Sequence, residues 1–179
     1  MNTELNWKEP VTISDLPPQG KEYELVPDIA ARAELAERAG VLAVQKLIAK
    51  LEVRPQGKAG AEVRGLLQAT VRQNCVVTLE PFDNYIEEKV LLFFEPEEAI
   101  AARGPVSEEL VGNDPPEPIV GGAIDLAALV AEFLTLSIDP YPRKPGAEFI
   151  VPTEDDGGKE ASPFAALAKL KPGQSGKKQ

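Results

Sequence analysis

The 179-residue sequence contains no histidine and only one cysteine, Cys75. The absence of histidine excludes Ser-His-Asp and Cys-His catalysis and removes the commonest ligand of catalytic zinc. A single cysteine cannot form an intrachain disulfide or a thiolate-rich zinc or iron–sulfur site. We therefore expect no metal, no cofactor and no catalytic centre, because carboxylates, Lys, Tyr and Ser would have to carry any chemistry alone.

The sequence also lacks long apolar segments. No apolar run approaches the ~20 residues that a membrane-spanning helix needs, and the first ten residues lack the basic-then-apolar pattern of a signal peptide. We expect a cytoplasmic protein that has no membrane partner.

The net charge of −10 comes almost entirely from one segment. Residues 80–120 hold 11 acidic and 2 basic side chains, whereas residues 1–79 hold 10 of each. Within the acidic segment, residues 95–122 combine Pro, Gly and acids without apolar periodicity, which predicts a long mobile loop. We expect one α+β domain over residues 1–152 and a flexible tail over residues 153–179.

Short β-rich segments and two amphipathic stretches follow one another in the order β-β-α-β-β-β-α. Asp28 and Asp125 are suited to cap the two helices, and Gly40 to end the first in a left-handed conformation. The order indicates an α+β fold: an antiparallel sheet that could be barrel-like, with two main helices packed on it. The expected strands are 9–14, 21–26, 45–54, 61–79 and 85–94, and the expected helices are 28–39 and 126–139.

The two central strands carry apolar residues at odd positions, which predicts that their odd faces point into the core. We expect the register that sets Val53 opposite Val63, because it also creates two cross-strand pairs of opposite charge. These pairs are Glu52 with Arg64 and Arg54 with Glu62.

Cys75 continues the apolar odd positions of the second central strand. This position predicts a buried core residue with a raised pKa and no reactivity. A reactive thiol would need a base or a cation nearby, and only Arg72 is close in sequence.

The even positions of the central hairpin carry its basic side chains. If Glu52 and Glu62 are neutralised by arginines, Lys46, Lys50 and Arg72 remain free to contact phosphate, although an ordinary charged sheet face fits the same pattern. Aromatic side chains for base stacking are absent from this face, which disfavours sequence-specific reading of single strands.

A stiff, proline-rich run over residues 139–145 presents an aromatic ring beside two cations. Rigid presentation of Tyr141, Arg143 and Lys144 suits phosphate contact or docking of a partner. A simple proline-rich exit from the last helix is the alternative.

Residues 162–170 in the polar tail begin with a serine and a proline and carry a short apolar stripe. This pattern predicts one to two turns of helix with Phe164, Leu167 and Leu170 on one side. Such a short helix is marginal alone, so we expect it to fold on a partner or to dock back on its own domain.

Three motifs in this order resemble the YceD-like family of large ribosomal RNA subunit accumulation proteins, and most of all its alphaproteobacterial branch. They are Cys75–Pro81 (CVVTLEP), Ile124–Leu126 (IDL) and Asp139–Gly146 (DPYPRKPG). The resemblance covers about residues 5–150 and extends to the apolar stripe of the tail. It implies a cytoplasmic bacterial factor for the synthesis, processing or stability of 23S ribosomal RNA, without an established enzyme activity.

The chain departs from many members of that family at their cysteines. Those members carry a Cys-x-x-Cys pair where Cys75 and Thr78 stand, and a second pair after the last helix, where this chain has the Tyr141–Pro145 run. The resemblance implies that the metal site of such members cannot form here. Cys75 is then left as a core residue, and Leu79–Pro81 fix the turn.

The residues and the resemblance together predict a non-catalytic ribosome-biogenesis factor. We expect it to contact large-subunit ribosomal RNA, or a precursor of it, through the basic sheet face. The alternative is an acidic adaptor or chaperone that holds a basic ribosomal protein through the 80–120 segment during assembly of the large subunit.

Overall fold

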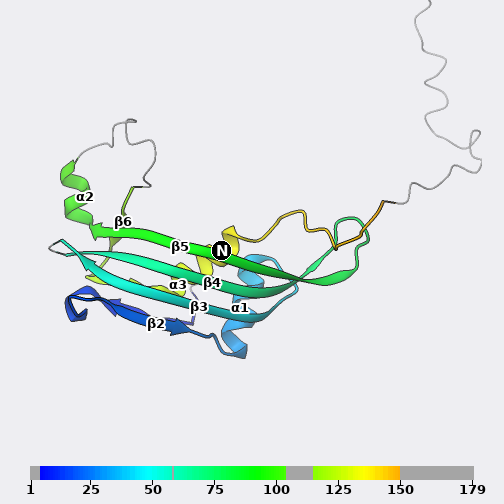
Figure 1. The fold of residues 1–179 in the computed structure, drawn as a ribbon, viewed down its shortest axis with the longest axis horizontal. Coiled ribbons are helices and arrows are strands. Elements are labelled where there is room, and N and C mark those ends of the chain that lie inside the picture. Colours follow the sequence, from blue (N-terminus) through cyan, green and yellow to red (C-terminus); the bar gives the residue numbers. More distant parts are fainter. Residues whose placement is uncertain (1–4, 58, 104–114, 150–179) are drawn as a thin grey trace, which may run out of the picture. The chain divides into compact units, whose positions relative to one another are not determined.

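A computed structural model describes residues 5–57, 59–103 and 115–149 (Figure 1), and the described residues up to Ala147 belong to one compact unit. A five-stranded sheet has the order β2-β3-β4-β5-β6, and a second sheet pairs β1 with β7. The strands are β1 (Pro10–Thr12), β2 (Lys21–Leu25), β3 (Ala43–Gln56), β4 (Gly60–Asn74), β5 (Pro81–Pro96), β6 (Glu117–Ile119) and β7 (Ala123–Asp125). The helices are α1 (Ile29–Ala39), α2 (Glu97–Arg103) and α3 (Leu126–Leu136), with one 3₁₀ turn at Ile13–Asp15.

The large sheet is antiparallel except at one end. Strands β2 to β5 pair antiparallel, and β6 joins β5 in parallel over only three residue pairs. Helices α1 and α3 both pack on one face of this sheet and lie behind it in Figure 1. The expected α+β class with two helices on a mostly antiparallel sheet is confirmed, and the sheet is open rather than closed into a barrel.

Both long helices begin at the predicted caps, and α1 ends at Gly40 as predicted, but α3 ends at Leu136, three residues before its expected end. The Asp28 carboxylate accepts the N–H of Ala31 at 2.8 Å, and Gly40 ends α1 with a φ of +66°. The Asp125 carboxylate caps α3 by accepting the N–H of Ala127 at 3.1 Å. Such caps satisfy N–H groups that have no partner inside the helix.

The core lies between the helices and the large sheet. Odd-numbered residues of β3 and β4 point into it, and Val53 lies opposite Val63 in the expected register. Those that are buried are Leu47, Ala49, Leu51, Val53, Ala61, Val63, Leu67, Ala69, Val71 and Gln73. The alternation ends at Asn74, so the expected burial of Leu79 is wrong: Leu79 lies in the turn before β5 with a φ of +60° and is exposed.

Gly65 is the odd-numbered residue of β4 at which no side chain fits. A Cβ atom at this position would lie 2.9 Å from the Leu51 Cα and closer still to the Lys50 carbonyl oxygen. Both atoms belong to the backbone of β3, which cannot rotate away. The two central strands can therefore approach one another here only because residue 65 is glycine.

The sequence predicts no helix or strand between residues 95 and 122, and this is wrong at both ends of the segment. Helix α2 follows β5 directly, and β6 returns to pair with the last residues of β5. Three residues are too few to show a period, so β6 could not be recognised from its sequence. The expected mobility of the segment is untested, and the expected short helix at 162–170, with Phe164, Leu167 and Leu170, lies outside the described residues.

Candidate nucleic-acid interface

The face of the large sheet that points away from the helices is open. From Lys46 onward the even-numbered residues of β3 lie on this outer face, together with even-numbered residues of β4 and odd-numbered residues of β5, and most are exposed or half-buried. Before Lys46 a bulge reverses the alternation of β3, and Val44 is buried. No helix packs on the outer face among the described residues. The face therefore presents side chains in rows that run across the strands.

Two of these rows carry the candidate lysines. One row contains Lys46, Thr70 and Tyr85, because Thr70 is the partner of both other residues. A second row, two steps further along the strands, contains Lys50 and Lys89 on either side of Leu66. Neighbouring strands are about 4.8 Å apart, so each row spans about 10 Å. We call these six residues the two-lysine rows, after Lys46 and Lys50, the predicted lysine of each row.

The prediction that Lys46, Lys50 and Arg72 share one face is confirmed by the strand register. The expectation that all three are free is wrong. The Lys50 ammonium lies 3.5 Å from the Glu24 carboxylate of β2. Lys46 forms no ion pair with any residue that the structure describes.

Arg72 is held by Asp83 on the neighbouring strand. Its Nε donates to Asp83 Oδ1 at 2.8 Å, and a terminal guanidinium nitrogen donates to Oδ2 at 3.2 Å. The Arg72 guanidinium lowers the pKa of Asp83, so the carboxylate stays ionised and the pair persists at neutral pH. Arg72 is thus the least available of the three predicted cations.

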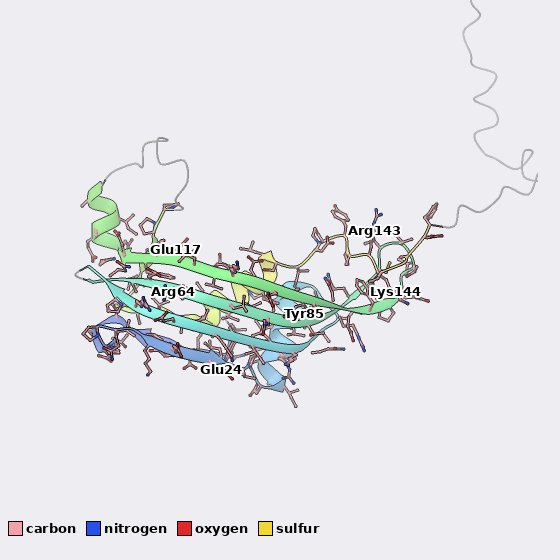
Figure 2. The ribbon with its side chains drawn as sticks, in the orientation of Figure 1. Glu24, Arg64, Tyr85, Glu117, Arg143 and Lys144 are labelled. Carbon is pink, nitrogen blue, oxygen red and sulfur yellow. The ribbon has the colours of Figure 1, made fainter. Side chains whose placement is uncertain are left out.

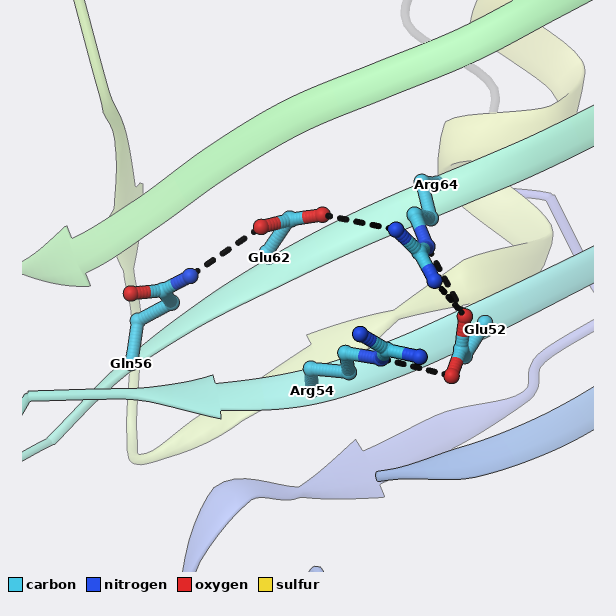
Figure 3. A network of polar contacts seen from close by, with 5 residues as sticks. All are labelled: Glu52, Arg54, Gln56, Glu62 and Arg64. Atoms are coloured by element: carbon cyan, nitrogen blue, oxygen red, sulfur yellow. Dashed lines mark hydrogen bonds and ion pairs between the residues drawn. The ribbon is translucent and has the colours of Figure 1, made fainter. Parts of the chain in front are cut away.

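A network of charged side chains occupies the other end of the outer face (Figure 3). Glu52 accepts from Arg54 Nε at 2.6 Å and from Arg64 Nε at 2.8 Å. Arg54 and Arg64 together hold the pKa of Glu52 below its usual range. Glu62 lies opposite Arg54, but it accepts a hydrogen bond from Gln56 at 3.0 Å and lies 4.0 Å from Arg64. The predicted pair of Glu52 with Arg64 is confirmed, whereas Arg54 pairs with Glu52 instead of the predicted Glu62.

The outer face carries aromatic rings that the hairpin sequence alone does not reveal. Tyr85 and Phe93 of β5 point outward and are 60% and 43% exposed. The hairpin itself carries no aromatic ring, but β5 extends the face beyond the hairpin and adds these two rings. The alternation of inward and outward side chains along β5 could have predicted that these two rings point outward.

A broad hollow lies over the outer face. It has a volume of about 960 Å³ and extends from Glu24 and Lys50 to Leu91 and Phe93. Its lining thus combines charged groups with apolar surface, which is the composition that ligand-binding concavities share.

The Tyr141–Lys144 segment packs against the turn between β4 and β5, at the end of the sheet away from Arg64 (Figure 2). The Pro142 carbonyl accepts the N–H of Val76 at 2.9 Å. Tyr141 is 74% exposed, and Arg143 is exposed and forms no ion pair among the described residues. Lys144 lies 2.9 Å from the Glu80 carboxylate, which raises the pKa of the lysine.

Cys75 is fully buried, as the sequence predicts, but its thiol is not that of an inert core residue. Its sulfur accepts backbone N–H groups from Val77, Thr78 and Lys144, each at 3.4 Å. Hydrogen bonding from the Thr78 side chain, assisted by these amides, lowers the pKa of Cys75 to about 6. The expected raised pKa is therefore wrong, because the donors outweigh the burial. Lys144 could not be identified as a neighbour, since it is 69 residues away in sequence.

The described residues hold neither a group of metal-ligating side chains nor a helix that could span a membrane. No group of three or more Cys, Asp and Glu side chains is placed to hold a metal ion in the described ranges. None of the helices described is both long enough and apolar enough to cross a bilayer.

Comparison with known proteins identifies a family. Searches of curated proteins and of solved structures returned no match. The model of one protein family, described as large ribosomal RNA subunit accumulation protein YceD, matches residues 63–171. This range runs from β4 through β5 and α3 and includes all three sequence motifs. The chain belongs to the YceD family.

Proposed function

We propose that this protein acts in the accumulation of large-subunit ribosomal RNA as a non-catalytic factor that binds the RNA through the two-lysine rows. The family description provides the link to large-subunit ribosomal RNA. The proposal places the protein in the bacterial cytoplasm, where this RNA is made. The RNA would be the 23S species or its precursor.

The chemistry of the rows suits single-stranded RNA. Exposed ammonium groups contact phosphates, and an exposed aromatic ring can stack on an unpaired base. Lys46 and Tyr85 lie in the same row, so one nucleotide segment could reach both. The observation that carries the proposal is this exposed ring beside an unpaired lysine on a sheet face that no helix covers among the described residues.

The ion pair of Lys50 is compatible with RNA binding. The side chains of Lys50 and Glu24 are 71% and 59% exposed. Ion pairs this exposed contribute about 0–1 kcal/mol. A phosphate group can therefore displace Glu24 at little cost.

The proposal also includes Tyr141, Arg143 and Lys144 as a second contact at the end of the sheet. Arg143 is the cation most available there, because Lys144 is paired with Glu80. Arg72 would contribute mainly by keeping Asp83 neutralised.

The test measures affinity for single-stranded fragments of large-subunit ribosomal RNA at several salt concentrations. The double change Lys46→Glu and Lys50→Glu should weaken binding and reduce the slope of log K against log salt by about 0.7 for each lost phosphate contact. Arg38→Glu is the matched control, because Arg38 is exposed on α1 in the helix layer. Equal losses in the double variant and the control would contradict the proposal.

A second pair of variants tests the ring. Tyr85→Ala should cost about 1–3 kcal/mol of binding free energy if a base stacks on Tyr85. Tyr85→Phe should bind normally, because it keeps the ring and loses only the hydroxyl that donates to Glu87 at 2.9 Å. Equal affinity of the alanine variant and the unchanged protein would rule out stacking.

The alternative role, in which the protein holds a basic ribosomal protein, rests on the acidic charge of residues 80–120. Much of this charge lies on β5, α2 and β6, and residues 104–114 lie outside the described ranges. Deletion of 104–114 removes three of the 11 acidic residues, so it should weaken ribosomal-protein binding under this alternative and leave RNA binding unchanged under the main proposal.

A further inference from the structure

Strand β5 leaves most of one edge without a partner strand. Its other edge pairs with β4 from Pro81 to Phe94, whereas β6 covers only residues 94–96. Among the described residues, no strand pairs with the outer edge over residues 81–93. We call this stretch the β5 edge.

The chain itself stops β6 from extending along the β5 edge. In the parallel register, the residues that precede Glu117 would lie beside residues 92 and 93. These residues are Pro115 and Pro116. Proline has no backbone N–H to donate to a ladder. A single proline such as Pro118 of β6 can take a position whose N–H would point away from β5, but one of two consecutive prolines must take a position that donates, so β6 ends here.

The β5 edge carries charged side chains but lacks three other common protections of an exposed strand. Natural edges are commonly short, bulged or interrupted by proline. Strand β5 has 16 residues, a register with β4 free of bulges and no proline between its first and last residues. Leu91 is 57% exposed and Phe93 is 43% exposed. By contrast, the opposite edge strand, β2, has five residues.

We propose that the β5 edge binds an extended, basic segment of another protein as an added antiparallel strand. The backbone N–H and C=O groups of the edge would supply the ladder, as in other cases of strand addition. Exposed Leu91 and Phe93 favour apolar partner residues at one end. This inference goes beyond the proposed RNA contact, since it concerns a protein partner and the backbone edge of β5, whereas the RNA contact uses the outward side chains of Tyr85 and Lys89.

The charge of β5 determines the kind of partner. The strand carries Asp83, Glu87, Glu88 and Glu95 but only one cation, Lys89. Asp83 is neutralised by Arg72, whereas Glu87 accepts only neutral donors, Gln68 at 2.9 Å and Tyr85 at 2.9 Å. A lysine or arginine opposite Glu87 or Glu88 would therefore form a new pair of opposite charges.

The same charges argue against a second copy of this chain as the partner. Antiparallel pairing of two β5 edges would bring together two strands that each have an excess of acids. Like charges opposite one another on neighbouring strands are destabilising. A basic partner segment gains free energy where a second copy would lose it.

The experiment uses the full chain and the synthetic peptide Val-Ile-Val-Thr-Thr-Lys-Lys. In an antiparallel alignment, its apolar half lies opposite residues 91–93 and its lysines lie opposite Glu87 and Glu88. Hydrogen exchange should show slower exchange of amides in residues 82–93 when the peptide is bound. A peptide with glutamates in place of the lysines should bind at least about tenfold more weakly. A backbone N-methylated peptide, which cannot form the ladder, should not protect these amides.

Matched leucine variants locate the site. Leu91→Lys places a positive charge beside the edge and should weaken binding of the lysine peptide about tenfold. Leu136→Lys changes an equally apolar, exposed residue on α3 and should leave the affinity unchanged. The Lys46→Glu and Lys50→Glu variant should also retain peptide binding, which separates this inference from the RNA proposal.

Three results would overturn the inference. The first is that the lysine peptide protects no amide of β5, or that its N-methylated form binds equally well. The second is sedimentation of the chain alone as a dimer that Leu91→Lys disrupts, which assigns the edge to a second copy. The third is protection of residues 82–93 by single-stranded RNA but not by the peptide, which assigns the edge to the RNA interface.

Discussion

Replacement of Gly65 by alanine tests the close approach of β3 and β4. The new Cβ would lie 2.9 Å from the Leu51 Cα and nearer still to the Lys50 carbonyl oxygen. Alanine in place of glycine normally stabilises a strand interior by about 0.5–1 kcal/mol, because glycine loses more backbone entropy on folding. Overpacking costs about 1–3 kcal/mol and should exceed this gain, since both obstructing atoms are backbone.

We expect Gly65→Ala to lower the free energy of unfolding by about 2 kcal/mol, which corresponds to a fall in Tm of about 4–8 °C for a domain of this size. Urea unfolding followed by the fluorescence of the single tryptophan measures the change. This residue, Trp7, packs against the core and should report its loss.

Gly57 provides the control for a different cause of strain. It has a φ of +60°, and a Cβ there would meet no atom within 4 Å. Asparagine tolerates positive φ better than alanine, so Gly57→Asn should be more stable than Gly57→Ala. At Gly65 the order should reverse, because the larger side chain clashes more. An unfolding free energy for Gly65→Ala equal to or above that of the unchanged chain would refute the reasoning.

Three further changes test the caps, the core and the thiol. Asp125→Ala should lower the free energy of unfolding by about 1–2 kcal/mol, whereas Asp125→Asn, which keeps an acceptor for the N–H of Ala127, should cost less in the same urea titration. Leu134 is fully buried, so Leu134→Ala should lower the free energy of unfolding by about 2–5 kcal/mol. Leu136 is 75% exposed, so Leu136→Ala should lower it by less than about 0.5 kcal/mol. Equal effects of the two changes in thermal unfolding would contradict the described core. The pKa of Cys75 is about 6, below its ordinary value of 9.0, so the buried thiolate stabilises the fold. This stabilisation should be complete above about pH 9 and should disappear as the pH falls through 6. In urea unfolding at the same pH values, a Cys75→Ala chain should lack this pH-dependent change in the free energy of unfolding.

The helices and the central hairpin could be predicted because their signals are local. Asp28, Gly40 and Asp125 are cap residues that act within one turn of helix. The β3–β4 register followed from residues on either side of a short loop, where Glu52 opposite Arg64 and Val53 opposite Val63 agree. Each of these features depends on residues close together in sequence.

The candidate interface was only partly predictable because its character depends on strands that meet through the fold. The partner of Lys50 is Glu24 on β2, and the partner of Arg72 is Asp83 on β5. A hairpin read alone shows neither acid. The register of β4 with β5 also places Tyr85 on the same face. This register joins residues of two strands and cannot be read from either strand alone.

The β3–β4 hairpin has a consequence for how the chain could be divided. The match to the family begins at Val63, yet β4 is paired with β3 on one side and with β5 on the other. A fragment that starts at Val63 would lose β2, α1 and β3, and the apolar residues of β4 would face water. The region of sequence similarity is therefore smaller than the smallest piece that can fold cooperatively, and a truncation designed from the similarity alone should aggregate.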